Sequence, residues 1–401
     1  MQRRRQSGHH SIIPNSTFPT SGDARRVAVI GAGLAGLSCA RTLTDHSIDV
    51  TVFDKGRSPG GRLATRRLPP HTFDLGAQYF TARDPRFRRQ VQSWLDAGVC
   101  APWPGRIVAL DGEGGPARPT SPLERLVGTP DMNALARRLA ADLHVATGQR
   151  IDRIERVAGM LALRGTTAPA GVTLGPAGPG ELGTTELGTF DCVVLCVPAD
   201  QAVALLDPIS VRLAHEAREV SLDPCFVVGL AAGRDDEALR ALAFDGAFIG
   251  RDGVPSASLL SWVARDSSKP GRPPGERWVL HASAAWSRAS GDMPREEVEA
   301  AMIAELSRLF DLGPQKPELS FVHRWGYARA QRPLDCGALF DEDARVGLGG
   351  DWACGGRVEG AFLSGVALAE RILGRADAPL GPAAQSDGQV SPNTDASGFK
   401  T

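Results

Sequence analysis

Residues 26–67 read RVAVIGAGLAGLSCARTLTDHSIDVTVFDKGRSPGGRLATRR, and this stretch decides the fold. The apolar run Val27–Ile30 predicts a buried strand, residues 31–36 (GAGLAG) predict a tight glycine-rich turn, and Leu37–Leu43 predicts an amphipathic helix. A second strand, Val50–Phe53, ends on Asp54, which lies 18 residues after Gly36. This order of elements, with an acidic residue at the end of the second strand, is typical of dinucleotide-binding proteins.

The glycines of this turn have separate physical roles. Gly31 permits the tight turn, Gly33 lets backbone N–H groups approach a pyrophosphate, and Gly36 lets the helix pack close to the strand. Leu34 and Ala35 of the turn join the predicted cofactor contacts, and the N-terminus of the helix that follows faces the anion. The carboxylate of Asp54 would accept hydrogen bonds from an adenosine ribose. The alternative is a glycine-rich turn in an ordinary α/β protein, and the flanking strands and the acid argue against it.

A second glycine-rich loop, from Lys55 to Arg62, indicates which dinucleotide is bound. A plain NAD domain has no need of such a loop, whereas flavoproteins of the amine-oxidase type close one over the FAD pyrophosphate. The forked guanidinium of Arg62, next to Gly61, would neutralise those phosphates. Lys55, Gly61 and Arg62 therefore join the predicted cofactor site.

A third element lies far along the chain. Residues 346–350 predict a short strand with a tight turn, and Asp351 at its end suits a ribityl hydroxyl of FAD. A final helix begins at Glu359 and runs to about Leu373, and its positive N-terminal end would stabilise the anion of a reduced flavin. We therefore expect FAD, held without a covalent bond. The remaining predicted cofactor contacts are Gln78, Ile151, Val197, Gly350, Arg357, Val358 and Ala361.

The composition narrows the class of protein. With 401 residues and a net charge of −1, the chain is long enough for about two domains and carries no bulk charge that would attract nucleic acid. Its 7 cysteines lack CxxC or metal-ligand spacing, which is typical of free thiols in a reducing cytoplasm, so we expect no metal. The sequence has no long apolar run, so we expect no membrane helix. We expect residues 1–23 and 375–401 to be disordered.

The predicted elements divide the chain into a discontinuous cofactor domain and an inserted substrate domain. We assign residues 24–80, 131–200 and 340–374 to the first, and residues 81–130 and 201–339 to the second. Met132–Leu143, with Asp131 as its N-cap, and Glu296–Phe310 predict helices, whereas Asp191–Val197 predicts a buried parallel strand. The predicted fold class is therefore α/β: a Rossmann-like FAD-binding domain, of the amine-oxidase and glutathione-reductase type, with an α+β substrate domain inserted.

Several strings of this sequence resemble known flavoproteins. The nucleotide-binding end resembles the FAD-dependent amine-oxidase superfamily, and strings in the middle resemble, more narrowly, renalase and its bacterial relatives. The strings are Gly61–Arg67, Phe73–Thr81, Trp262 with Asp266–Arg272, Trp278–Ala282 with Trp286–Ser287, Trp325–Ala328, and Gly350–Trp352 with Arg357–Ala361. The resemblance covers residues 25–373 and leaves out both ends and an insertion at 165–188.

This resemblance implies non-covalent FAD and a particular reaction. Renalase-type enzymes oxidise the 2- and 6-dihydro isomers of NAD(P)H: hydride passes to the flavin, NAD(P)⁺ leaves, and O₂ reoxidises the flavin to give H₂O₂. We therefore expect a cytoplasmic monomer or homodimer that acts in metabolite repair. Its expected partners are a nicotinamide dinucleotide isomer and O₂, with no nucleic acid and no membrane.

The substrate slot is expected to consist of aromatic side chains. Hydride transfer from a dihydropyridine needs proximity, orientation and a dry, flat slot, so we expect no catalytic acid or base. The candidates are Tyr79, Trp262, His281, Trp286, Trp325 and Tyr327, each of which could equally be a core aromatic. For His281 we favour the core interpretation. We expect Arg66 and Arg67 to be solvated surface charges and Lys269 to lie in a surface turn.

Three other functions stay open at this point. A true amine oxidase usually places two tyrosines from its C-terminal half before the flavin, but the 2 tyrosines of this chain are Tyr79 and Tyr327, and Tyr79 comes too early. A desaturase acting on a lipid or a porphyrinogen would need a long apolar membrane-binding segment, which is not obvious here. The third alternative is a redox sensor or FAD-bound scaffold without turnover.

Overall fold

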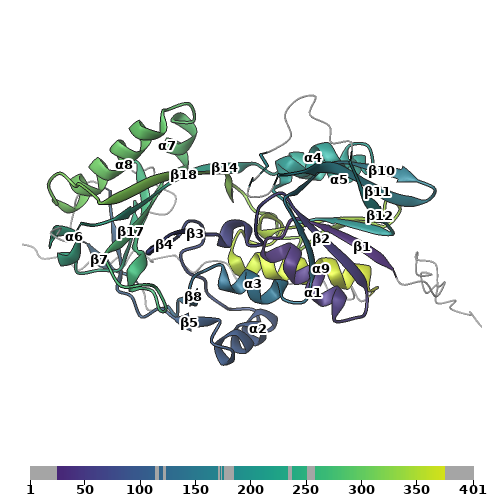
Figure 1. Ribbon diagram of the computed structural model, residues 1–401, viewed down its shortest axis with the longest axis horizontal. Coiled ribbons are helices and arrows are strands. Elements are labelled where there is room, and N and C mark those ends of the chain that lie inside the picture. Colours follow the sequence, from purple (N-terminus) through teal and green to yellow (C-terminus); the bar gives the residue numbers. More distant parts are fainter. Residues whose placement is uncertain are drawn as a thin grey trace, which may run out of the picture.

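The structure is a computed structural model that describes residues 25–112, 117–120, 123–169, 172, 174–175, 185–233, 237–250 and 258–374. These residues form two lobes, each built on its own sheet, and the long strands β14 (Leu222–Ala231) and β18 (Leu319–Ala330) extend from one lobe toward the other (Figure 1). The ends expected to be disordered, and residues 176–184 of the insertion, lie outside the described residues.

The cofactor lobe is built on a six-stranded sheet in which five neighbouring strands are parallel. Apolar β1 is the central strand, and its side chains are buried from Val27 to Ile30, as the uninterrupted hydrophobic run requires of a strand covered on both faces. Only the edge strand β19 runs antiparallel. The order is β19 (Leu339–Asp341), β20 (Val346–Leu348), β13 (Cys192–Leu195), β1 (Arg26–Ile30), β2 (Asp49–Asp54) and β9 (His144–Thr147).

Helices cover one face of this sheet and a second sheet covers the other. On the first face lie α1 (Leu34–Thr44), α3 (Ala134–Ala140) and α9 (Val358–Ile372), which share a core with Val27 and Val52. On the second face lies an antiparallel sheet of β10 (Gln149–Val157), β11 (Met160–Thr167) and β12 (Thr185–Phe190), with α4 (Ala199–Leu206) and α5 (Val211–Arg218). This three-layer arrangement confirms the predicted α/β class.

The second lobe is a seven-stranded, mostly antiparallel sheet. The order is β18, β14, β17 (Arg277–Ala282), β16 (Leu260–Arg265), β15 (Gly246–Ile249), β6 (Ile107–Leu110) and β7 (Arg118–Pro119). One face packs on α6 (Glu237–Ala241), α7 (Ala284–Ala289) and α8 (Arg295–Phe310), with Val298, Met302 and Leu306 of α8 fully buried. The other face looks toward the cofactor lobe (Figure 1).

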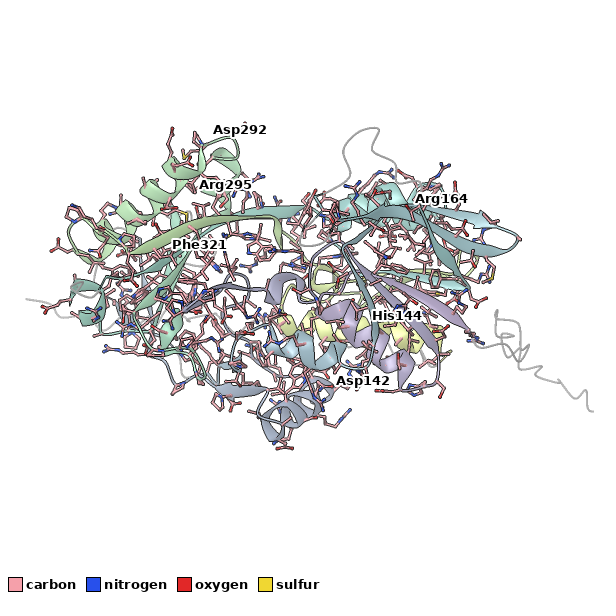
Figure 2. The ribbon with its side chains drawn as sticks, viewed as in Figure 1. Asp142, His144, Arg164, Asp292, Arg295 and Phe321 are labelled. Atoms are coloured by element: carbon pink, nitrogen blue, oxygen red, sulfur yellow. The ribbon has the colours of Figure 1, made fainter. Side chains whose placement is uncertain are left out.

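Shorter elements lie outside the three large sheets. They are η1 (Gly61–Leu63), the hairpin of β3 (Thr65–Leu68) and β4 (His71–Asp74), α2 (Pro85–Asp96), β5 (Cys100–Pro102), β8 (Leu126–Gly128), η2 (Asp266–Ser268) and η3 (Asp351–Ala353). Phe73 of the hairpin packs edge-on against Phe321 of β18, with ring centroids 5.1 Å apart; Phe321 is labelled in Figure 2. The hairpin therefore docks on the inner face of the substrate sheet.

Candidate active site

The turn between β1 and α1 needs glycine at two positions for reasons internal to the protein. Gly31 has a φ of +106°, and a Cβ on it would lie 2.5 Å from the carbonyl oxygen of Cys196. A Cβ on Gly36 would lie 1.9 Å from the carbonyl oxygen of Gly31, so helix and turn can approach only with glycine here. A Cβ on Gly33 would meet no protein atom within 4 Å. The space beside Gly33 is therefore open to a ligand.

Asp54 ties this turn to the second glycine-rich loop. One carboxylate oxygen accepts a hydrogen bond from the backbone N–H of Ala32 at 2.6 Å, and the other accepts one from Gly56 at 2.6 Å. Burial raises the pKa of Asp54, and these two hydrogen bonds lower it by less, so the net shift is upward. Next to it, Lys55 Nζ donates to Gln201 Oε1 at 3.0 Å.

Arg62 and Asp351 meet although they come from opposite ends of the chain. Arg62 Nη1 lies 3.0 Å from Asp351 Oδ2, Nη2 bonds to the other oxygen, and Nη1 also donates to the carbonyl of Ala328 at 3.0 Å. A Cβ on Gly61 would lie 3.2 Å from the Cα of Gly33, so the two glycine loops touch. The residues predicted for the pyrophosphate and for the ribityl chain are thus brought into contact.

The final helix begins at Val358, and no side chain caps its N-terminus. Its N-cap residue is Arg357, and Ala361 lies in the first turn, so the predicted contacts stand at the positive end of the helix. The N–H of Gly350, just before η3, donates to Ser364 Oγ of the same helix at 3.0 Å.

Val197 and Ile151 are two apolar residues predicted for the cofactor site, and Val197 lies beside the turn between β1 and α1. Val197 packs beside Gly31, 3.2 Å from the position that a Cβ would take there. Ile151 is buried in the core that Ile30 and Phe53 share with the three-stranded sheet. The space beside Gly33 and the donors of Arg62 and the α9 N-terminus suit the phosphates of a flavin dinucleotide, and the roles of the other predicted contacts stay predictions.

A row of rings crosses the inner face of the substrate sheet. Trp262 and His281 are cross-strand partners on β16 and β17, and Trp325 pairs with Cys225 between β18 and β14. Trp325 Nε1 donates to the carbonyl of Leu75 at 3.2 Å, which joins this face to the cofactor-lobe segment. Tyr327 lies two residues after Trp325, where the register between β18 and β14 is irregular, and one residue before the Arg62 contact at Ala328.

Tyr79 extends this row toward the edge of the sheet. Its ring lies 5.8 Å from that of Trp262 and 6.3 Å from that of Trp103. Phe248 of β15 lies on the other side of Trp262, with centroids 4.6 Å apart. Trp103 and Phe248 were missed by the sequence analysis, because a ring in a loop and a ring on a short strand show no pattern that places them at a site.

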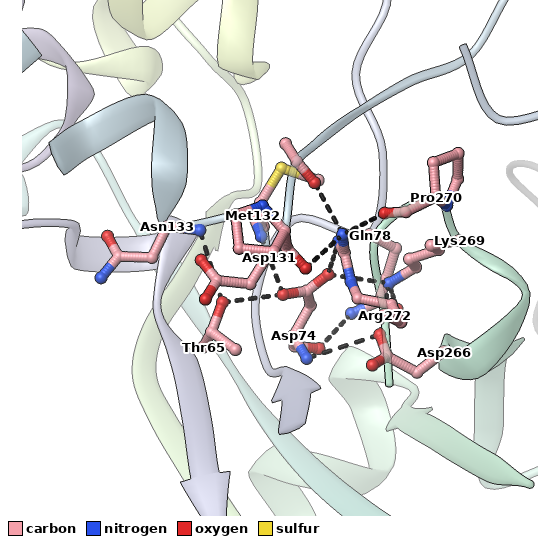
Figure 3. Close-up of polar contacts among 12 residues, drawn as sticks. Thr65, Asp74, Gln78, Asp131, Met132, Asn133, Asp266, Lys269, Pro270 and Arg272 are labelled. Carbon is pink, nitrogen blue, oxygen red and sulfur yellow. Dashed lines mark hydrogen bonds and ion pairs between the residues drawn. The ribbon is translucent and has the colours of Figure 1, made fainter. Parts of the chain in front are cut away.

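A buried cluster of charges lies beneath this face (Figure 3). Lys269 Nζ lies 2.7 Å from Asp266 Oδ1 and 3.3 Å from Asp74 Oδ2, and it also donates to Gln78 Oε1 at 3.0 Å. Arg272 forms an ion pair with Asp74, and all four charged side chains are at most 1% exposed. The expectation that Lys269 lies in a surface turn is therefore wrong. Its apparent turn sequence, SSKPG, folds inward because two buried carboxylates need its charge.

The pKa values of the two carboxylates in the cluster are shifted in opposite directions. Burial raises the pKa of Asp266 above its usual range, and Lys269 only partly offsets this. For Asp74 burial acts in the same direction, but the charges of Lys269 and Arg272 outweigh it, so its pKa falls well below its usual range. Asp74 is therefore the permanent anion of the pair.

The histidines on this face are neutral at pH 7. Burial, followed by the nearby charge of Lys269, lowers the pKa of His281 to about 4. Burial, followed by the charges of Arg66 and Arg295, lowers the pKa of His323 to about 4. His281 Nε2 lies 3.5 Å from Gln78 Nε2, so it stands at the cluster rather than deep in an apolar core.

Comparison with known proteins agrees with this geometry. A profile described as an NAD(P)-binding Rossmann-like domain matches residues 29–94, and one described as a flavin containing amine oxidoreductase matches residues 94–373. The chain belongs to the flavin-containing amine oxidoreductase family. It is an oxidoreductase, and FAD is its cofactor.

Individual relatives of the family match over short segments. A zeta-carotene-forming phytoene desaturase of Myxococcus xanthus is 43% identical over 56 residues, which is 14% of this chain and 11% of that one. An L-glutamate oxidase precursor of Streptomyces diastatochromogenes is 37% identical over 94 residues, 22% of this chain and 14% of the relative. The matched segments thus span about a seventh or less of these relatives.

Solved structures share the whole architecture. A putative protoporphyrinogen oxidase from Exiguobacterium sp. 255-15 superposes with a TM-score of 0.67 at 12% identity, covering 87% of this chain and 99% of that one. A redesigned putrescine oxidase gives a TM-score of 0.63 at 12% identity, covering 88% and 99%. At this identity the likeness establishes the fold alone.

Within this amine oxidoreductase fold, one predicted slot residue lies elsewhere. Trp286 is on α7 and packs against Phe226, with ring centroids 5.9 Å apart, on the helix-covered face of the sheet. The structure therefore does not bring Trp286 to Tyr79, Trp262, His281, Trp325 and Tyr327. Trp286 is only five residues after His281, but the chain leaves β17 at Ala282 and crosses to the other face of the sheet before residue 286. Closeness in the sequence therefore does not place the two rings at one site.

Arg66 and Arg67 lie at the surface, as the sequence analysis expected. Arg66 is exposed, and its guanidinium carbon lies 4.4 Å from the centre of the Phe321 ring. Arg67 is also exposed, and its Nη2 lies 2.5 Å from Asp131 Oδ2.

Burial raises the pKa of Cys354, beside η3, to about 11, which leaves its thiol protonated and inert. In the part of the chain that the structure describes, no helix is long and apolar enough to cross a bilayer.

Proposed function

We propose that this enzyme removes a hydride from the 2- and 6-dihydro isomers of NAD(P)H and releases NAD(P)⁺, with O₂ as the final acceptor and H₂O₂ as the second product. The observation that carries the proposal is the row of Trp262, His281 and Trp325 on the inner face, whose histidine is neutral at pH 7. Such a face can hold a flat ring, and it offers no charged imidazole to exchange protons with it.

The chemistry of the donor fits what these residues supply. A dihydropyridine already carries the electron pair that leaves with its hydrogen, and its product ring becomes aromatic, so the protein needs only to orient it and exclude water. Bound FAD supplies the hydride acceptor. The neutral imidazole of His281 adds an uncharged ring to this face. The amide of Gln78 beside it is already bonded to the carbonyls of Asp74 and Gly76 and to Lys269 Nζ, so it fixes the position of that ring.

Electrostatics favour this donor over an amine. An alkylamine is a cation at neutral pH and needs a carboxylate partner, but the buried carboxylates beside the face, Asp74 and Asp266, are already paired with Lys269 and Arg272. We further propose that FAD is held without a covalent bond, because the protonated thiol of Cys354 is a poor nucleophile.

Anaerobic mixing tests the proposal directly. The purified flavoprotein is mixed with 2-dihydro- and 6-dihydro-NAD(P), and flavin absorbance is followed. We expect bleaching within seconds, formation of NAD(P)⁺, and one H₂O₂ per flavin when air is admitted. Bleaching by amines or amino acids but by no dinucleotide isomer would replace this function with an amine oxidase. No bleaching by any of these donors would favour a scaffold without turnover.

A further inference from the structure

Arg125 is a buried cation that makes no ion pair with any described carboxylate. Its side chain belongs to a residue only 9% exposed. Nη1 donates to the carbonyl of Leu123 at 3.3 Å and Nη2 to Thr120 Oγ1 at 3.3 Å, both long bonds to neutral acceptors. Its Nε is buried and has no hydrogen-bond partner in the described structure. A guanidinium removed from water normally requires an anion, so this arrangement is costly for the protein alone.

Other buried arginines of the chain show what is missing. Arg272 is paired with Asp74, and Arg150 with Asp152 at 2.5 Å. Glu124, the neighbour of Arg125, is exposed, and the described structure has no ion pair between the two side chains. Arg277 is also buried without an ion pair among the described residues, but its guanidinium donates to the backbone carbonyls of Pro273 and Pro274. Arg125 differs from these arginines in lining an open hollow.

Arg125 lines an open hollow that adjoins the row of rings. The hollow has a volume of about 460 Å³ and is walled by Trp103, Ile107, Thr120, Glu124 and Arg125 among others. The guanidinium carbon lies 5.4 Å from the centre of the Tyr79 ring, which in turn lies 5.8 Å from Trp262. Tyr79 thus stands between the hollow and the substrate face, and a volume of this size suits part of a small-molecule ligand.

We propose that Arg125 binds an oxyanion of the substrate, with the phosphate groups of the dihydronicotinamide dinucleotide as the occupant. This inference rests on the proposed function, because it assigns a place to the charged half of the same molecule. The forked guanidinium recognises phosphate and carboxylate in the same way, so the carboxylate of an amino acid is the other source of this chemistry. In either case the anion supplies the charge partner that no described carboxylate provides to Arg125.

Binding without turnover is the first test. Calorimetry of the FAD-loaded enzyme with inorganic pyrophosphate is compared for wild type, Arg125→Met, and the control Arg118→Met, which removes an exposed arginine from β7. We expect the Kd to rise about 10- to 100-fold in Arg125→Met and to stay within twofold in the control. Failure of wild type to bind either pyrophosphate or L-glutamate, or equal binding by wild type and Arg125→Met, overturns the proposal.

Two outcomes separate the sources of the anion. Loss of pyrophosphate binding in Arg125→Met supports the phosphate as occupant, even if no dinucleotide isomer bleaches the flavin. L-glutamate binding that depends on Arg125, without pyrophosphate binding, supports the oxyanion site and rejects the phosphate as its occupant. The site and the proposed function can therefore fail independently.

Steady-state kinetics supply a readout that a structural role would not move. We expect Arg125→Met to raise KM at least tenfold for the dihydro-NAD isomer, to leave kcat within twofold, and to leave both constants unchanged for the corresponding dihydronicotinamide riboside, which has no phosphate. Its melting temperature should not fall, since the substitution removes an unpaired buried charge. Equal KM effects on the dinucleotide and the riboside would overturn the assignment.

Discussion

The ammonium of Lys269 lies 3.3 Å from the carboxylate of Asp74, and both side chains are sealed from solvent. The two residues are 195 positions apart, one at the end of the β3–β4 hairpin and the other after η2 on the substrate sheet. Their ion pair therefore fastens the hairpin to the substrate lobe directly beneath the row of rings.

Breaking this pair should cost far more than breaking an exposed one. We expect Lys269→Met to lower the free energy of unfolding by about 3–5 kcal/mol, because it leaves Asp74 and Asp266 with less compensation in a buried site. The matched control is Arg218→Met, whose partner Asp207 and own side chain are 45% and 47% exposed, and which should cost about 1 kcal/mol or less. Urea unfolding measures both, and equal losses would contradict the role of the cluster.

The neutral histidines should make stability depend on pH in a defined window. The pKa of His281 is lowered from 6.5 to about 4, so between these values the unfolded chain binds more protons than the folded one. Stability contributed by this group is complete above pH 6.5 and is lost as the pH falls toward 4. In mid-window one such group gives a slope of about 1.4 kcal/mol per pH unit.

Substitution isolates this contribution. In His281→Gln, the free energy of unfolding should depend less steeply on pH, by the contribution of one titrating group. Urea unfolding measured from pH 7.5 down to pH 4.5 gives this dependence. The slope that remains should come in part from His323, whose pKa is also about 4. An unchanged slope in His281→Gln would show that the imidazole is protonated in the folded enzyme.

Two glycines of the same turn should fail in different ways. Gly33→Val adds side-chain atoms to a space where a Cβ meets no protein atom, so the protein should fold but be purified without its yellow flavin. Gly36→Ala places a Cβ 1.9 Å from a backbone oxygen, so it should lower the melting temperature as well. Absorbance near 450 nm and thermal melting distinguish the two, and a fully yellow Gly33→Val protein would sink the assignment of the pyrophosphate site.

Two tryptophans provide a matched pair for the substrate face. Trp262→Leu should lower kcat/KM for the dinucleotide isomer about tenfold or more, because it removes a ring from the row beside His281. Trp286→Leu removes a ring of similar size from the opposite face and should leave kcat/KM within twofold while lowering stability. Similar kinetic losses in both would mean that the face is wrongly chosen.

Local sequence patterns predicted much of the cofactor lobe. The expected strand Val27–Ile30 lies within β1, Val50–Phe53 lies within β2, and the expected helix Glu296–Phe310 differs from α8 by one residue. These elements are encoded by apolar runs and helical periodicity, which depend on near neighbours alone. The glycine-rich turn at residues 31–36 could be predicted for the same reason, because its signal lies within six neighbouring residues.

Features that depend on residues far away in the sequence could not be predicted from local patterns. Asp131 was expected to cap a helix from Met132, but α3 begins at Ala134, and Asp131 instead pairs with Arg67 and Arg137. Lys269 and Trp286 were misplaced because nothing in their own segments shows which carboxylates or which face of the sheet they will meet. The hollow at Arg125 could not be foreseen, since its walls come from separate segments.

The strand β20 and the helix α9 complete the cofactor lobe, yet they are the last elements of the described chain. A Cβ on Gly365 of α9 would lie 2.1 Å from the carbonyl oxygen of Ala35, so the last helix rests directly on the first. On the ribosome, the nucleotide turn must therefore wait for residues 346–372 to be synthesised before these neighbours arrive. We therefore expect a chain truncated before β20 to lack one side of the cofactor lobe and to bind no FAD.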